Sequence, residues 1–209
     1  MGVVMNKANV DLMSEARGLL KGNWGLPITV TVLCIAMGTG FSIIPIIGWL
    51  TTFIIQPQIG VGASIFYLNL SREKEIDIKQ LFFTFKDMNR FGNIIGAYLL
   101  AILCTILGFI CLIIPGIILH IAFSQIFFIL AEDDNLGPVE ALKKSYNLMN
   151  GNKWTYFCLL CRFIGWGILS ILTFGIGFLW LYPYCWVSLA KFYDNISLNY
   201  RTLNLESTN

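Results

Sequence analysis

The chain has 209 residues, of which 56% are hydrophobic and only 12% are charged, and its mean hydropathy is +0.71. Soluble domains carry about 25% charged residues, so this composition predicts an integral membrane protein. Basic and acidic residues nearly balance at a net charge of +2 and share the same loops, which excludes a basic nucleic-acid-binding surface.

Three long stretches that are almost free of charge predict the membrane helices. Each stretch is about twice the roughly 20 residues that one helix needs to cross a bilayer, so each predicts a pair of spans. The fold class is therefore all-α integral membrane: six transmembrane helices as three hairpins, in a single polytopic domain covering residues 1–209. The predicted spans are 26–44, 49–69, 92–113, 116–132, 154–172 and 177–193. The turns fall at Pro45 and Gly48, at Pro115 and Gly116, and at Gly175 and Gly177.

The basic residues predict the orientation of these helices. Every lysine and arginine except Arg162 lies before the first span, between the second and third, between the fourth and fifth, or at the C-terminal end. The three short turns on the other side carry no charged residue. By the positive-inside rule both termini are cytoplasmic.

One unit recurs three times, over about residues 9–70, 77–134 and 138–195. Each unit consists of an amphipathic segment, a Gly-Asn junction and a hairpin. We expect each amphipathic segment to lie as a helix on the cytoplasmic leaflet. Its apolar residues have helical spacing: Leu12, Met13, Ala16, Leu19 and Leu20 in the first; Ile78, Leu81, Phe82, Phe85 and Met88 in the second; Val139, Leu142, Tyr146 and Met149 in the third. Asp77 is a predicted N-cap, and Pro138 suits a first helical turn.

Several blocks of the chain resemble a bacterial integral membrane family, domain of unknown function 975. The most specific are "ARGLLKGNWG" and the segment "EALKKSYNLMNG", and a third is "FIGWGILSILTFGIGFLWLYPYCWVSLAKFYD". The motif positions are Arg17, Lys21, Gly22, Asn23, Trp24, Pro115, Gly116, Ala141, Ser145, Gly151, Pro183 and Tyr184. The resemblance implies a six-helix protein of a bacterial plasma membrane, distantly similar to the membrane domain of glycerophosphodiester phosphodiesterases. It implies no activity, catalytic residue or cofactor.

Arg162 is the one basic residue of the chain that is not assigned to the cytoplasmic loops and ends. About eight residues separate it from Trp154, or roughly 12 Å of helix, so its guanidinium could reach the cytoplasmic surface. One hypothesis is that Arg162, together with Lys143 and Lys144, binds an anion or a lipid phosphate. The alternative is an orienting residue that contacts headgroups or a cytoplasmic acid.

Other polar groups give weaker signals. Glu132, Asp133 and Asp134 end the fourth span, where they oppose the helix dipole; Lys143, Lys144 and Arg162 are the expected partners, and ordinary solvation is favoured over a metal site. His120 and Ser124 share a helix face but have no orienting acid nearby, so interhelical hydrogen bonding is favoured over catalysis. Cys158 and Cys161 form a C-x-x-C without a second ligand pair, which favours packing over zinc.

These observations favour a non-enzymatic membrane protein without a cofactor, an accessory or immunity type of subunit. Its expected contacts are membrane lipids, and a membrane-active peptide, a transporter or an export-system protein are further candidate partners. The alternative is a small transporter or channel with a polar cavity at Arg162 that opens to the cytoplasm. A lipid-modifying enzyme is disfavoured for want of a catalytic set.

Overall fold

The computed structural model describes residues 8–22, 24–40 and 45–207, apart from the side chains of residues 39–40, 45–52, 204 and 206–207. The described residues are helical and contain no strand. In chain order the helices are α1 (Asn9–Leu20), α2 (Gly25–Gly40), α3 (Pro45–Ser71), the 3-10 helix η1 (Ile78–Phe85), α4 (Met88–Cys111), α5 (Ile113–Ala122), α6 (Ile126–Glu132), α7 (Pro138–Leu148), α8 (Lys153–Leu172) and α9 (Phe178–Ser207).

Five of the six predicted spans each fall on one helix within the described residues, and the fourth falls on α5 and α6. Among the described residues, four helical segments are long and apolar enough to cross a membrane: Phe53–Ser71 of α3, α4, Ile113–Glu132 and α8. A fifth candidate span results if α1 and α2, which are bent by 102° relative to each other, are counted as one broken span. The structure therefore supports a helical membrane protein with four or five such segments. Six spans, the three-hairpin arrangement and the interfacial amphipathic helices stay predictions.

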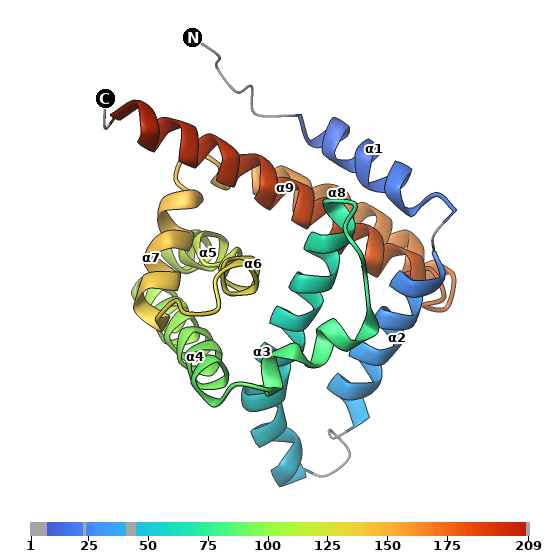
Figure 1. The fold of residues 1–209 in the computed structure, drawn as a ribbon, viewed down its shortest axis with the longest axis horizontal. Helices are drawn as coiled ribbons and strands as arrows, with labels where there is room; N and C mark the ends of the chain where they lie inside the picture. Colours follow the sequence, from blue (N-terminus) through green and yellow to red (C-terminus); the bar gives the residue numbers. More distant parts are fainter. Residues whose placement is uncertain (1–7, 23, 41–44, 208–209) are drawn as a thin grey trace.

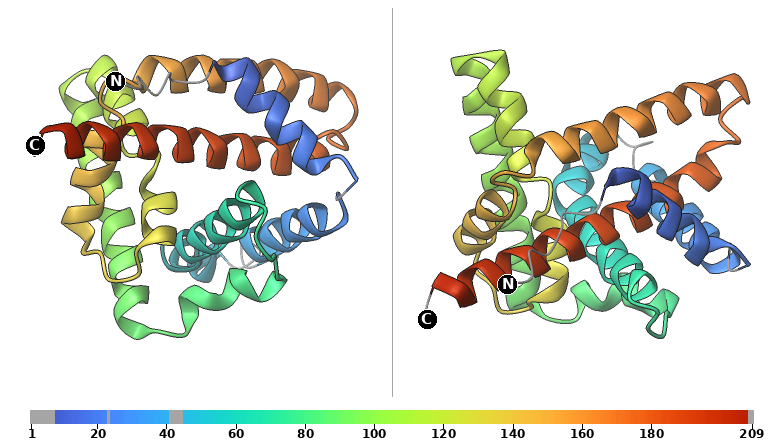
Figure 2. Two further views of the ribbon diagram at one scale, coloured as in Figure 1. Left: turned by 45° about the horizontal axis from the view of Figure 1, so that its top comes forward. Right: turned by 90° about the horizontal axis from the view of Figure 1, so that it is seen from above.

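The helices of the three predicted pairs contact each other within each pair. Between α2 and α3, the hydroxyls of Thr31 and Tyr67 lie 3.3 Å apart. Between α8 and α9, the rings of Phe163 and Tyr184 pack edge to face with their centroids 5.6 Å apart. The pairs do not form one bundle of parallel helices, however. In Figure 1, α2 and α3 extend below α9, and in Figure 2 (left) α8 and α9 lie crosswise to α4.

The turn between α4 and α5 lies three residues before the expected position. Leu112 is extended, with φ −168° and ψ 154°, so Pro115 and Gly116 lie within the first turn of α5. A proline is tolerated there because its missing N–H would have no partner in the helix. Gly116 has a packing role, since a Cβ at this position would clash with the ring of Phe109. The turn between α8 and α9 is glycine-based as predicted, with φ +84° at Gly175. Pro45 and Gly48, where the first turn is expected, lie in the first turn of α3, so this prediction is wrong; residues 41–44 lie outside the described residues.

The predicted fourth span is interrupted between Ala122 and Ile126. The interruption frees backbone carbonyls that a continuous helix would satisfy, and in an apolar environment such groups need other partners. The hydroxyl of Ser145 in α7 donates to the carbonyl of Ala122 at 2.7 Å. Ser145, like Ala141 one turn earlier, is fully buried. Helix α7 therefore packs against the break and supplies the missing hydrogen bond.

The three amphipathic segments differ from one another. In α1 the buried apolar residues are those that the spacing predicts, with Leu12, Ala16 and Leu20 almost fully covered. The second segment is a 3-10 helix, and Asp77 caps it by accepting from the N–H of Lys79. There only Leu81 and Thr84 are buried, while the remaining predicted apolar residues include Phe82 and Phe85 at about 40% exposure.

Helix α7 buries only part of the apolar face that the spacing selects. Pro138 is its first residue, as expected, and Leu142 is buried. Val139 and Tyr146, however, are 53% and 44% exposed. The buried face is instead formed by small residues together with leucines, namely Ala141, Leu142, Ser145 and Leu148. Close approach of α7 to the broken helix requires small residues, which a hydrophobicity pattern does not select.

Candidate functional site

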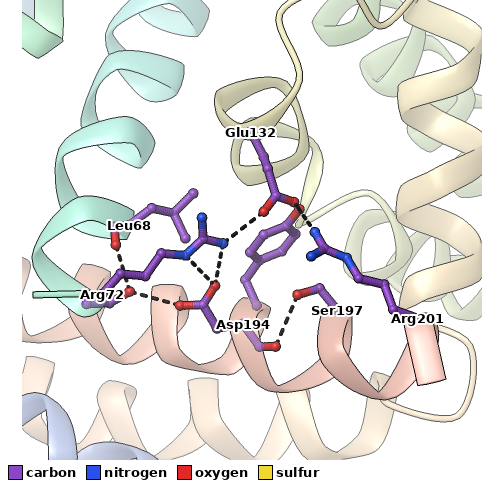
Figure 3. A network of polar contacts seen from close by, with 8 residues as sticks. Leu68, Arg72, Glu132, Asp194, Ser197 and Arg201 are labelled. Atoms are coloured by element: carbon purple, nitrogen blue, oxygen red, sulfur yellow. Dashed lines mark hydrogen bonds and ion pairs between the residues drawn. The ribbon is translucent and has the colours of Figure 1, made fainter. Parts of the chain in front are cut away.

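Charged residues from three helices meet at the end of α3 (Figure 3). The Arg72 guanidinium donates to Asp194 Oδ1 of α9 from Nε at 3.0 Å and from Nη2 at 2.6 Å. Its Nη2 also donates to Glu132 Oε1 of α6 at 3.0 Å. Burial alone lowers the pKa of Arg72, but the hydrogen bonds and charges of Asp194 and Glu132 outweigh it and raise that pKa. Arg72 is therefore charged at physiological pH and connects α3, α6 and α9.

The acids of this network have partners on all four oxygens. Glu132 Oε2 accepts from the Tyr193 hydroxyl at 2.8 Å and from Arg201 Nη2 at 3.0 Å. Asp194 Oδ2 accepts from the Ser71 hydroxyl at 3.0 Å. Because each carboxylate oxygen accepts a hydrogen bond from a protein group, this partly buried cluster stabilises one particular packing of the helices.

A second ion pair neutralises Asp134. The Arg90 side chain, only 4% exposed, contacts Asp134 Oδ1 at 2.7 Å and donates to the carbonyl of Leu130 at 3.3 Å. Its guanidinium also lies 5.5 Å from the ring centre of Phe83, in cation–π contact.

The partners expected for the acids at the end of the fourth span are therefore wrong. Lys143, Lys144 and Arg162 form no ion pair with Glu132 or Asp134 in the described part of the chain; Arg72, Arg201 and Arg90 do. The sequence placed all of these residues on one side of the membrane but gave no signal for the pairing. The partners come from positions 44 to 69 residues away, so no local spacing connects them.

The two candidate lysines lie beside different cavities. Lys144 borders one of about 610 Å³, together with Glu132, Tyr193, Tyr200 and Arg201. Lys143 borders a separate cavity of about 530 Å³ between α4 and α7. Arg162 is exposed on α8 and borders none of the four cavities found among the described residues. The three cations thus share no cavity, and anion or lipid-phosphate binding by them stays a prediction, as does a transport pathway at Arg162.

His120 and Ser124 border one cavity of about 410 Å³ between α4, α5 and α8. The Ser124 hydroxyl accepts a hydrogen bond from Gln125 at 3.0 Å. No acid lines this cavity within the described residues. Ser124 therefore has a polar contact, and the lining of this cavity supplies no orienting carboxylate of the kind that a nucleophile and base would need.

Motif positions from opposite ends of the chain converge on a fourth cavity, of about 350 Å³. Arg17, Trp24 and Tyr184 line it, and Trp166 and Trp180 complete its wall. We call this cavity the tryptophan pocket. It lies between the end of α1, the second half of α8 and the start of α9. The sequence singled out Arg17, Trp24 and Tyr184 separately, whereas nothing in the sequence pointed to Trp166 and Trp180.

Arg17 is held in the tryptophan pocket by Tyr184. Its guanidinium carbon lies 5.7 Å from the ring centre of Tyr184, whose hydroxyl donates to the carbonyl of Met13 at 3.3 Å. Arg17 is exposed and forms no ion pair with an acid among the described residues. The pocket therefore presents one uncompensated cation beside three indole rings.

The remaining motif positions have structural roles or lie at the surface. Gly22 and Gly151 have positive φ, +96° and +81°, in the turns that precede α2 and α8. Lys21 is exposed, and Pro183 is buried within α9. Asn23 lies outside the described residues.

Residues 99–200 match the family described as Protein of unknown function (DUF975). The chain belongs to this family. The matched segment runs from α4 into α9 and includes Glu132, Ser145, Tyr184 and Asp194, while Arg17 and Trp24 precede it. Searches of curated proteins and of solved structures gave no significant match. The distant similarity to glycerophosphodiester phosphodiesterases stays a prediction.

Proposed function

We propose that this protein is a multi-pass, non-enzymatic protein of a bacterial plasma membrane that acts through contact with anionic membrane lipid. The observation that carries the proposal is the tryptophan pocket, in which Arg17 has no acidic partner among the described residues and lies beside Trp24, Trp166 and Trp180. Tryptophan favours the level of the lipid headgroups, and arginine forms two parallel hydrogen bonds with phosphate. Such a combination suits a phosphate group whose acyl chains lie against apolar side chains.

The distribution of basic residues supports cytoplasmic termini, and this holds for any even number of crossings. A lipid-binding accessory subunit needs no catalytic group. It needs instead a membrane-facing surface with a cation at headgroup depth. The ion pairs around Arg72 join α3, α6 and α9, and they favour a rigid arrangement of the helices behind this surface.

The test measures lipid binding to the purified full-length protein by native mass spectrometry. We expect phosphatidylglycerol to bind more tightly than phosphatidylcholine, and Arg17→Gln to weaken phosphatidylglycerol binding about five- to tenfold, or about 1 to 1.4 kcal/mol. The matched control is Lys79→Gln, which removes the same charge from a side chain that is 91% exposed and remote from the pocket. Equal affinity of wild type and Arg17→Gln for phosphatidylglycerol would refute the proposal.

A further inference from the structure

Helix α1 packs against the α8–α9 pair near both ends of α1. At the start of α1, the amide of Asn9 donates to the carbonyl of Thr155, in the first turn of α8. Near the end of α1, Arg17 lines the tryptophan pocket together with Thr173 and Gly177, which belong to the turn between α8 and α9. Figure 2 shows α1 against this pair. We call the three helices the α1–α8–α9 layer.

The outer side of α1 is charged and exposed. Asp11, Arg17 and Lys21 all have exposed side chains, while the apolar side of the helix is buried against the layer. Unpaired charges do not remain in the hydrocarbon of a bilayer, and they lie in the headgroup layer or in water. Asn9 of α1 donates to the first turn of α8, and Arg17 lines the pocket that reaches the α8–α9 turn, so both ends of the pair lie close to this polar helix. A pair that crossed the bilayer would carry Arg17 deep into the membrane.

After Lys153 at its start, α8 carries one charged residue, Arg162, on one side of its exposed surface. Arg162, Trp166 and Leu169 follow the i, i+4, i+7 spacing of one helix face, and the last two line the tryptophan pocket beside Arg17. A separate stripe is purely apolar and at least 40% exposed; it consists of Phe157, Ile164, Ile168 and Ile171. This division is typical of a helix that lies along the interface, with cations toward the headgroups and apolar residues toward the acyl chains.

Tryptophans mark both ends of the α8–α9 pair. Trp154, 74% exposed, lies at the start of α8, and Trp166 and Trp180 lie near the turn at the other end. A spanning hairpin would also place tryptophan at two interfaces, so this pattern alone does not decide. The decisive difference is that Trp166 and Trp180 share a pocket with Trp24 and Arg17. The positive-inside rule assigns the N-terminal segment that carries Trp24 and Arg17 to the cytoplasmic side, so we place the α8–α9 turn on that side as well. In addition, α8 and α9 lie crosswise to α4, which has the highest hydropathy of the candidate spans (Figure 2).

We propose that the α8–α9 pair lies within the headgroup layer of the cytoplasmic leaflet, with α1 on its polar side, and does not cross the membrane. The partner of this surface is a lipid bilayer, with Arg17 and Arg162 directed to phosphates. The length and hydropathy of α8 would suffice for a span, but its packing against a charged helix opposes one. Both termini remain cytoplasmic, because removing two crossings leaves their number even. The inference does not rest on lipid selectivity of the tryptophan pocket.

The test locates the α8–α9 turn by thiol labelling. Phe174, 99% exposed, and Ile176, 60% exposed, are each replaced by cysteine in full-length protein whose six native cysteines are changed to alanine. A membrane-impermeant maleimide is then applied to spheroplasts and to inside-out vesicles. Lys79→Cys is the cytoplasmic control, and Leu112→Cys reports on the α4–α5 turn. We expect Phe174→Cys and Ile176→Cys to react in inside-out vesicles, as Lys79→Cys does, and not in spheroplasts.

Labelling of the two turn positions in spheroplasts would overturn the proposal, and so would labelling from neither side. If the alanine-substituted protein does not fold, the native chain carries a biotin-acceptor peptide inserted between Phe174 and Gly175. Biotinylation by the cytoplasmic ligase is then the expected result, and its absence in a protein that retains wild-type thermal stability contradicts the inference. Loss of lipid selectivity in Arg17→Gln together with labelling of the turn in spheroplasts would support the proposed function and reject this inference. Unchanged selectivity in Arg17→Gln together with a cytoplasmic turn would do the opposite.

Discussion

Arg72 and Asp194 are 122 residues apart in the chain and are joined by hydrogen bonds of 2.6 and 3.0 Å, with side chains only 28% and 22% exposed. This contact connects the end of α3 to the middle of α9 (Figure 3). Because Glu132 shares the same guanidinium, α6 belongs to the same polar junction. The structure thus depends on one arginine at the place where three separately predicted segments meet.

Arg72→Gln should destabilise the protein strongly, because it leaves two partly buried carboxylates without their main partner. We expect a loss of about 2 kcal/mol, below the value for a fully buried pair because solvent still reaches these side chains. For a chain of this size that corresponds to a fall in Tm of about 4 to 8 °C. Thermal unfolding in detergent measures it, with Lys79→Gln as the control. An unchanged Tm would show that the junction does not stabilise the fold.

Ser145→Ala should lower stability by about 1 kcal/mol, because the Ala122 carbonyl loses its hydrogen bond at the interruption between α5 and α6. Ser14→Ala is the matched control, since the Ser14 hydroxyl donates to the carbonyl of Asp11 at an exposed position. Equal unfolding temperatures for the two variants would argue against the proposed role of α7 in supporting the break.

Gly62→Ala should destabilise the contact between α3 and η1. An added Cβ would clash with the backbone carbonyl of Leu81, which cannot move without displacing η1. The expected cost is about 1 to 3 kcal/mol, as for other overpacked sites. Gly165→Ala in α8 meets no atom within 4 Å and should be neutral or stabilising, since alanine favours helix. Thermal unfolding of the two variants gives the comparison, and equal destabilisation would contradict the packing described here.

Arg162→Leu should leave ion permeation unchanged in reconstituted liposomes. Arg162 is exposed on α8 and borders none of the four cavities described above, so we expect permeation not to depend on its charge. The measurement is the flux of small anions and cations through liposomes that contain wild-type or variant protein. Flux in the wild type that disappears in Arg162→Leu would favour the transporter alternative over lipid contact.

Much of the helical framework could be predicted from the sequence. The long uncharged stretches predict the approximate positions of most of the apolar helices. The positive φ at Gly175 and the N-cap at Asp77 follow from local conformational preferences. The buried side of α1 was predicted correctly, because its apolar residues recur with one regular period. In α7 the apolar spacing does not identify the whole buried face, because Ala141 and Ser145 are buried there through close helix packing and a hydrogen bond.

The candidate site was accessible to sequence reasoning only in pieces. Arg17, Trp24 and Tyr184 could be singled out, but their convergence with Trp166 and Trp180 requires the packing of α1 against α9. The network of Arg72, Glu132 and Asp194 gave no signal either, because electrostatic pairing between distant segments leaves no periodic pattern.

The sequence by itself determined that this protein is helical, apolar and suited to a membrane, and it determined roughly where most of the helices lie. These properties are local, since they depend on transfer of successive side chains into an apolar medium and on backbone preferences. Only the tertiary structure decided which charges pair, that α1 lies along α8 and α9, and that the helix pairs run in different directions. Those features depend on contacts between residues far apart in the chain, whose energies are fixed by shape and hydrogen-bond geometry and not by the order of residues in any one segment.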